Sequence, residues 1–503
     1  MANSKGVSNF DFIKVISKFS KKEMSEFNKM LRSPFYNNHS TILILFTELR
    51  KYHPGFDNKI LTKEYLFGIV NKGKKYNDTL FRKYLSRLYK LAEAFLNFSE
   101  RNTEPFDYEL NILRQLSKRN IDDIYERKKK EINKKLVSKG KLNLDHFYKL
   151  HKLCEINGYH SAKNNGSRES QNDLLDSTIH IFIHFLTVTC INLGQFETDL
   201  VTFKSSFGHE YDHSILKNIN VEYYLSELKK NKRTLNQKDI ILIEIITNDL
   251  KLNSKTQREP SYKKLREHVF KNTEMIEKDY LLYLLKRMNT FCISEQLKNN
   301  ADYDKDLFEN YKYILENGLF NLEGTPSLNL NDFKAILYSA TRNNEYEWLK
   351  NFIKEYKDHF GIISGAEIYN YGMAYLSFFK KEYELSLEYL AKISIRQFIF
   401  TLDSYILKSK NYFEMGFREP SISVSNAFRH FLNNNEAISE DLKSGLINYL
   451  KYYKILLSLK EKYNFERSFK ILNEIKRTPK LRNKEWLLEK AQELLDMNSN
   501  NEL

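Results

Sequence analysis

Apolar residues recur at every third or fourth position along most of the chain, which is the period of a helix with one buried face. The clearest stretch runs from Asp78 to Leu96. Its apolar positions fill one arc of about 160°, and four basic residues fall on the opposite side. The apolar positions are Leu80, Phe81, Tyr84, Leu85, Leu88, Leu91, Ala92, Phe95 and Leu96, and the basic ones are Arg82, Lys83, Arg87 and Lys90.

Helix start signals agree with this pattern, and strand signals do not persist. Ser20 followed by Glu23 predicts a capping box before a helix that stops at Ser33-Pro34. Only 16 Gly and 7 Pro occur in 503 residues, so the turn residues of sandwiches and barrels are scarce. The sequence therefore predicts an all-α protein.

Composition divides this helical chain into three expected segments. The polar stretch from His160 to Asp173 has the character of an exposed loop and is the best candidate boundary. We expect an N-terminal basic helical domain at 1–159, a middle helical region at 174–319, and stacked helical hairpins with a terminal capping helix at 320–498.

The hairpin prediction rests on the stretch from Glu367 to Ser394. Tyr371-Gly372 is followed by Ala374 and Tyr375 on one helix, and Tyr383 then opens a second helix that carries Ser386, Leu390 and Ile393. This order resembles the tetratricopeptide repeat, although Ile368 stands where that repeat has tryptophan and no proline closes the unit.

Spacing of neighbouring residues extends the resemblance. Tyr346 lies 37 residues before Tyr383, and Phe417 lies 34 residues after it, close to the tetratricopeptide period of about 34. An irregular helical bundle with coincidental spacing is the alternative. The resemblance implies a solenoid whose first helices line a concave groove, with Asn370, Tyr371 and Tyr375 as groove residues.

Positive charge is concentrated in the first third of the chain. Lys and Arg outnumber Asp and Glu by 31 to 17 in residues 1–150, and by 49 to 48 in the remainder. Such asymmetry favours an anionic partner, whereas a generally lysine-rich surface is the alternative. The candidate nucleic-acid-binding residues are Arg82, Lys83, Arg87 and Lys90, together with Arg127, Lys128, Lys129, Lys130, Lys134 and Lys135.

The first of these clusters lies in a segment, Leu61 to Leu96, that faintly resembles the winged-helix domain of bacterial transcriptional activators. Leu61-Thr62-Lys63-Glu64 opens one helix of that segment, and Leu85-Ser86-Arg87-Leu88 lies within the next. No β-hairpin signal for a wing follows Leu96. The chain as a whole resembles a group of uncharacterised bacterial helical proteins, and this similarity implies no activity.

Motifs for catalysis or cofactors are weak. The run His209-Glu-Tyr-Asp-His213 matches the pattern of zinc peptidases, but it follows a polar segment and lacks the apolar helix those enzymes need. His180 and His184 are spaced for a metal on one helix face, yet core histidines are commoner. Phosphate-binding and nucleophile-elbow patterns are absent from the sequence, so we expect no enzyme, no metal and no cofactor.

Cellular context follows from cysteines and hydropathy. Cys154, Cys190 and Cys292 have no disulfide or zinc spacing. The apolar run from Ile179 to Leu193 is shorter than the roughly 20 residues of a membrane span and predicts a buried helix. We expect a cytoplasmic scaffold that binds a protein or peptide, with nucleic-acid binding by the basic domain as the alternative and the oligomeric state left open.

Overall fold

The computed structural model describes residues 7–103, 105–136, 141–164, 167–202, 220–230, 235–253, 257–296, 301–324, 330–360, 364–394, 398–435 and 438–499. Within these ranges every regular element is a helix, and strand-like pairing is limited to isolated bridge residues such as Leu142 with Ile276. This confirms the all-α fold class. The chain divides into two compact units, residues 1–132 and 133–503.

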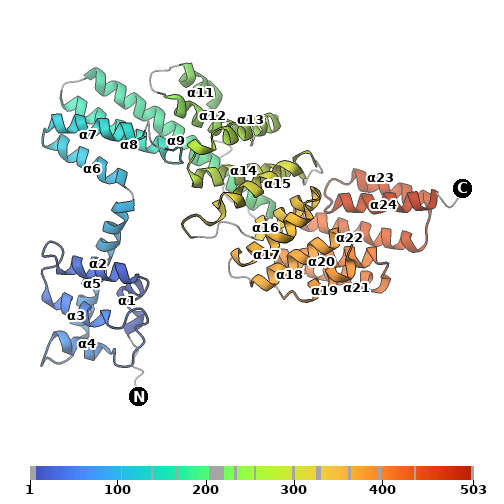
Figure 1. Cartoon of the computed structure of the whole chain (residues 1–503), viewed down its shortest axis with the longest axis horizontal. Coiled ribbons are helices and arrows are strands. Elements are labelled where there is room, and N and C mark those ends of the chain that lie inside the picture. Colours follow the sequence, from blue (N-terminus) through green and yellow to red (C-terminus); the bar gives the residue numbers. More distant parts are fainter. Residues whose placement is uncertain are drawn as a thin grey trace. The chain divides into compact units, whose positions relative to one another are not determined.

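In the first unit, the helices α1 to α5 lie together (Figure 1). They surround one apolar core that extends from Val7 to Phe95. The longest of them, α5, contacts each of the other four. These helices are α1 (Asp11–Ile16), α2 (Lys21–Arg32), α3 (Ser40–Arg50), α4 (Lys63–Val70) and α5 (Asp78–Thr103), and α6 (Pro105–Lys118) and α7 (Asp122–Lys134) follow.

Helix starts in this unit are set as the sequence predicts. The Glu23 backbone N–H donates to Ser20 Oγ at 3.1 Å, and the Ser20 N–H donates to the Glu23 carboxylate at 2.6 Å, which confirms the capping box. The Leu80 N–H donates to Asn77 Oδ1 at 3.0 Å, so Asn77 caps α5. The helix continues past its predicted end at Leu96 to Thr103.

Helices of the second unit pack mainly as neighbouring pairs (Figure 1). One core cluster extends from Leu142 to Phe400, and a second extends from Ala374 to Leu495. The segment boundaries predicted at 159 and 320 fall inside this unit. Its first helices are α8 (His146–Lys163), α9 (Ser167–Thr202), α11 (Val221–Lys230), α12 (Gln237–Lys251), α13 (Arg258–Lys271), α14 (Lys278–Gln296) and α15 (Asp304–Glu316).

The prediction of an exposed loop from His160 to Asp173 is wrong, because most of this stretch belongs to α8 and α9. These two helices pack closely at Gly158, where an added Cβ would lie 3.0 Å from the side chain of Leu174. Ser170 Oγ donates to the Gly158 carbonyl at 2.9 Å across the same contact. The polar side chain of Ser170 thus forms its hydrogen bond with a neighbouring helix, and composition alone does not reveal such a contact.

The hairpins predicted at the C-terminal end are present as four helix pairs in the described residues. Tyr346 and Tyr383 begin second helices, and Phe417 directly precedes one, as the spacing predicts. The pairs are α16 (Leu330–Arg342) with α17 (Tyr346–Tyr356), α18 (Gly365–Phe379) with α19 (Tyr383–Ala391), α20 (Phe398–Glu414) with α21 (Arg418–Asn433), and α22 (Glu440–Glu461) with α23 (Phe465–Arg477). The expected terminal helix is α24 (Lys484–Ser499).

The turns inside the first three pairs share one backbone geometry. Asn344, Lys381 and Gly416 have φ of 58°, 64° and 75°, and each lies two residues before the next helix starts. In each turn the following N–H donates to the carbonyl five residues earlier, at 2.9, 2.8 and 2.9 Å. This hydrogen bond is that of a helix closed by a left-handed residue, so the three pairs turn by the same means.

Candidate functional site

The first helices of the C-terminal hairpins carry the predicted groove residues. Tyr371 on α18 is 1 % exposed, and its hydroxyl donates to Asp403 Oδ2 at 3.0 Å. Burial, with the nearby Asp403 carboxylate, raises the Tyr371 pKa well above its usual value. Tyr371 is therefore a core residue, which corrects its assignment to the groove surface.

Asn370 and Tyr375 remain half-buried on the same helix. The Tyr375 ring lies 5.0 Å from that of Phe379. Burial, with Tyr338 and Asp403 nearby, raises the pKa of its hydroxyl. These two side chains retain some accessible surface next to the core.

Gly372 accounts for the close packing of α18 against α17. A Cβ at this position would lie 2.8 Å from Cγ1 of the buried Ile353 side chain. Ser386 on α19 is fully buried, and its Oγ donates to the Ala374 carbonyl at 2.7 Å. These small residues thus permit two close helix contacts: Ser386 packs within its own hairpin, and Gly372 packs against the preceding one.

Among the described residues, six aromatic or charged side chains on the first helices contact the terminal helix α24 or the residue before it. We call this set the α24 seat. It comprises Arg342 on α16, Lys410, Phe413 and Glu414 on α20, and Tyr449 and Tyr453 on α22.

Trp486 is the aromatic centre of the seat. Its ring centroid lies 5.2 Å from Phe413 and 6.3 Å from Tyr453, and its indole N–H donates to Glu414 Oε1 at 3.0 Å. The Lys410 ammonium lies 5.4 Å from the indole centroid and donates to Asn483 Oδ1 at 2.8 Å. Burial lowers the Lys410 pKa to about 8.

Charged side chains surround this centre. Lys490 of α24 is 6 % exposed and lies 3.0 Å from Glu414, 3.0 Å from Glu489 and 2.8 Å from Glu493. Burial alone would lower its pKa, but hydrogen bonds to these three carboxylates raise it. Sequence reasoning missed the seat, because helical periodicity marks Trp486 and Lys490 only as positions on the last helix.

Arg342 connects α24 to the first of the four hairpins. Its guanidinium pairs with both Asp304 and Glu485, and it lies 5.4 Å from the Tyr338 ring centroid. Glu485 is 143 positions further along the chain. The terminal helix therefore contacts first helices from three of the four hairpins.

The basic residues predicted on α5 are exposed, opposite its buried arc. Arg82 Nε lies 2.6 Å from Asp78 Oδ2. No ion pair joins Lys83, Arg87 or Lys90 to a carboxylate in the described residues. One apolar position departs from the prediction, since Leu96 is 42 % exposed.

The basic residues of the second predicted cluster lie among acidic ones. Arg127 pairs with Asp123 at 3.7 Å, Lys128 with Glu109 at 3.4 Å and Glu131 at 3.1 Å, and Lys129 with Glu126 at 3.8 Å. Lys130, Lys134 and Lys135 are exposed. Carboxylates thus offset part of this charge, and its nucleic-acid role stays a prediction. The wing of a winged helix is not found among the described residues after α5.

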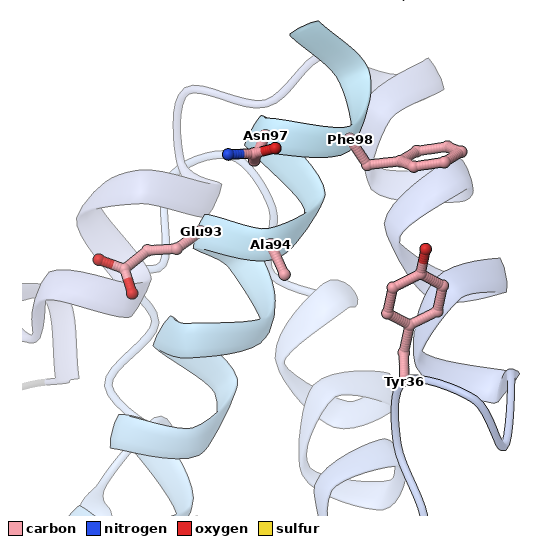
Figure 2. A pocket seen from close by; sticks show the side chains of 5 residues that line it. All are labelled: Tyr36, Glu93, Ala94, Asn97 and Phe98. Carbon is pink, nitrogen blue, oxygen red and sulfur yellow. The ribbon is translucent and has the colours of Figure 1, made fainter. Parts of the chain in front are cut away.

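A cavity of about 410 Å³ opens on the surface of the first unit (Figure 2). It is lined by Tyr36, Glu93, Ala94, Asn97 and Phe98. The aromatic rings of Tyr36 and of Phe98 on α5 border one side of it (Figure 2). Glu93, Ala94 and Asn97, also on α5, complete the lining.

Phe35 extends this aromatic surface. Its side chain is 87 % exposed, and its ring meets Tyr36 edge-on at 5.2 Å. The sequence pattern gave no signal for this surface, because it lies where the apolar arc of α5 leaves the core.

The candidate metal histidines lie between α8 and α9. His180 Nδ1 is 3.8 Å from Cys154 Sγ, and its ring stacks on Phe147 at 5.8 Å. Burial lowers the His180 pKa to about 4. Over the described ranges, no group of three or more metal-ligating side chains converges. The motif at 209–213 lies outside the described residues.

The apolar run predicted as a buried helix lies in α9. The segment Arg168–Gly194 is long and apolar enough to cross a membrane by length and composition. Ile183, Leu186 and Cys190 are buried, whereas Phe185 and Val188 are exposed. One face of this helix is therefore packed in the core and the other is partly open.

Comparison of the chain with protein-family models, with curated proteins and with solved structures finds no match in any of the three.

Proposed function

We propose that this protein is a non-enzymatic helical-repeat scaffold that binds a protein or peptide partner through the first helices of its C-terminal hairpins. We further propose that these hairpins form a tetratricopeptide-like solenoid. In such a solenoid each helix pair contacts mainly its neighbours, so the stack presents a row of equivalent positions. This row forms an extended surface on which a partner can bind.

Equivalent positions in the second helices support the repeat. Ser386, Ser421 and Ser468 each lie three residues after the start of α19, α21 and α23, and all three are buried. Leu349 takes the same place in α17. A small side chain at a fixed place in successive helices is typical of a repeated packing contact.

The observation that carries the binding proposal is the α24 seat itself. First helices from three hairpins bring aromatic rings and both signs of charge onto one face that accommodates a helix. Tryptophan, tyrosine and arginine dominate the energetics of protein interfaces, and all three occur at this contact. Such a face suits an amphipathic helix better than a small ligand.

Selection from a displayed library of random amphipathic peptides against the full-length protein tests this proposal. Selected peptides carrying a photoreactive group are then cross-linked, and the attached residues are identified by mass spectrometry. We expect dissociation constants below about 10 µM and cross-links on α16, α18, α20 and α22. Binding no better than that of scrambled peptides, or cross-links confined to second helices, would refute it.

Nucleic-acid binding by the first unit is a second candidate function. It is favoured by Lys83, Arg87 and Lys90, which are exposed and unpaired among the described residues of that unit. A variant with Arg82, Lys83, Arg87 and Lys90 changed to Gln should fold normally, because these side chains oppose the buried arc.

Fluorescence anisotropy with duplex DNA and single-stranded RNA over a salt series tests the second candidate. If α5 binds phosphates, the slope of log affinity against log salt should decrease in magnitude by about three in the variant. The matched control changes Lys305, Lys451, Lys462 and Lys470 to Gln. Equal slopes for both variants, or no binding by the wild type, would eliminate this function.

A further inference from the structure

The geometry points to the α24 seat as a docking site for an amphipathic helix that carries a tryptophan beside an acidic edge, and to α24 as an internal ligand that fills the seat in the free protein. This inference rests on the proposed function and specifies its partner. It assigns to the terminal helix a role beyond closing the stack.

The reach of α24 distinguishes it from a simple capping helix. A capping helix covers the apolar side of the last hairpin, and α24 does pack on α22 and α23. It also contacts Lys410, Phe413 and Glu414 on α20 and Arg342 on α16. These contacts lie on first helices of different hairpins, which is where a bound partner of a helical repeat has access to several units at once.

The contact has the composition of a recognition site around one anchor. Trp486 is enclosed by aromatic rings from α20 and α22, its N–H is satisfied by Glu414, and a cation lies over its face. Large aromatic anchors in well-packed pockets provide most of the affinity in helix-in-groove complexes. The seat therefore selects a partner with a tryptophan one helical turn before a lysine, as Trp486 and Lys490 are spaced.

Charge complementarity defines the rest of the partner. Glu485, Glu489 and Glu493 repeat every fourth residue, so they form one acidic edge along α24. The seat offers Arg342 to the first of them. Lys410 has no ion pair in the described structure and lies in the field of Glu489 and Glu414. A partner helix with the same acidic edge would meet the same two cations.

The polar content of the contact makes exchange feasible. Arg342, Lys410, Glu414 and Lys490 recover water when α24 leaves, whereas an apolar core would gain nothing from solvent. The apolar side chains Leu487, Ala491, Leu494 and Leu495 are buried as well. A partner must therefore cover the apolar surface of the hairpins that becomes exposed when these α24 side chains move away.

A tethered ligand competes with any free one at a high effective concentration. A short connector can raise the local concentration of the tethered segment to the millimolar range, and the affinity for a partner falls in proportion to the fraction of seats that are open. Weakening α24 within the chain should thus increase the affinity for a free helix of the same sequence.

The test uses a fluorescently labelled peptide of residues 484–499, KEWLLEKAQELLDMNS, and full-length protein. We expect the chain variant Trp486→Ala to bind this peptide at least about tenfold more tightly than the wild-type chain does. The chain variant Gln492→Ala, altered on the exposed side of α24, should bind like the wild type. A peptide with alanine in place of tryptophan should not bind the Trp486→Ala chain.

Equal affinity of the wild-type and Trp486→Ala chains for the peptide would overturn the inference. If library peptides bind the hairpins but the α24 peptide does not, the proposed function survives and the internal ligand is rejected. If neither binds, both fail. Wild-type dimers that the peptide dissociates would assign the seat to α24 of a second copy and overturn the assignment to a separate partner.

Hydrogen exchange on the wild type keeps the inference testable if Trp486→Ala does not fold. Amides from Leu487 to Leu495 should exchange at least about tenfold faster than those of α22, because α24 opens without unfolding the hairpins. Exchange of α24, α22 and α23 through a single common opening would show that α24 is part of the fixed core, and would refute its role as an exchangeable ligand.

Discussion

Replacing Lys410 with methionine should stabilise the protein, although it removes a charge and a hydrogen bond. Burial lowers the Lys410 pKa from 10.5 to about 8. Because the unfolded chain keeps the higher value, the folded state is destabilised at every pH at which Lys410 carries a proton. At pH 7 this shift corresponds to about 3 kcal/mol of lost stability.

Lys410 lies 5.9 Å from the ring centroid of Phe378 on α18 as well as over Trp486. Methionine keeps the length of the lysine stem and so its packing against these two rings. The hydrogen bond to Asn483 is lost, which costs about 1 kcal/mol. The net expectation is a gain of about 2 kcal/mol in the free energy of unfolding at pH 7. Lys470→Met on exposed α23 is the matched control, with a change within about 0.5 kcal/mol.

Urea denaturation followed by tryptophan fluorescence measures these free energies. As the pH rises through 8 toward 10.5, folded Lys410 loses its proton and the penalty disappears. The advantage of Lys410→Met should therefore shrink by about 2 kcal/mol between pH 7 and pH 9.5. A destabilised variant, or an advantage that does not change with pH, would contradict the burial argument.

Three further predictions concern packing, turns and pH. Gly372→Leu should lower the free energy of unfolding by at least about 2 kcal/mol, because its Cβ would overlap the buried Ile353 side chain of α17. The control Gly68→Ala, on the open side of α4, should be neutral or stabilising by up to about 1 kcal/mol. Equal melting temperatures for the two variants would contradict the close contact at Gly372. Both Lys381 and Gly416 have positive φ, which favours glycine. Lys381→Gly should therefore raise the free energy of unfolding by about 0.5–1 kcal/mol, and Gly416→Ala should lower it by a similar amount. Urea titrations that show a change of the same sign for both variants would oppose this reasoning. Burial lowers the His180 pKa to about 4, so the histidine gains a proton on unfolding once the pH falls below 6.5. Acidification from pH 7 to 5 should therefore lower the free energy of unfolding by about 2 kcal/mol, and a His180→Gln variant should not show this loss. Parallel profiles of unfolding free energy against pH for the two chains would refute this prediction.

Local patterns in the sequence predicted the helices and their starts well. The capping box at Ser20, the helix from Asp78 and the hairpin spacing around Tyr383 all depend on residues within about one helical turn or one repeat of each other. The prediction of a polar loop from His160 to Asp173 is wrong for a physical reason. Ser170 forms its hydrogen bond with the Gly158 carbonyl of the neighbouring helix, and such a contact between helices cannot be read from composition.

The candidate site was only partly predictable for a related reason. The resemblance to a repeat assigned the partner surface to the first helices, which stays a prediction, and it placed the core residue Tyr371 on that surface. The contact between Arg342 and Glu485 joins residues 143 positions apart. Neither periodicity nor motif spacing relates such positions, since the packing of several helix pairs decides which first helices meet the last helix.

Hydrogen exchange of the full-length protein, with and without a saturating library-selected peptide, tests the central claim most directly. A partner that docks on the first helices should displace α24, so exchange from Leu487 to Leu495 should accelerate while the amides of α20 and α22 keep or gain protection. Unchanged or increased protection of α24 in the presence of bound peptide would contradict a shared docking site.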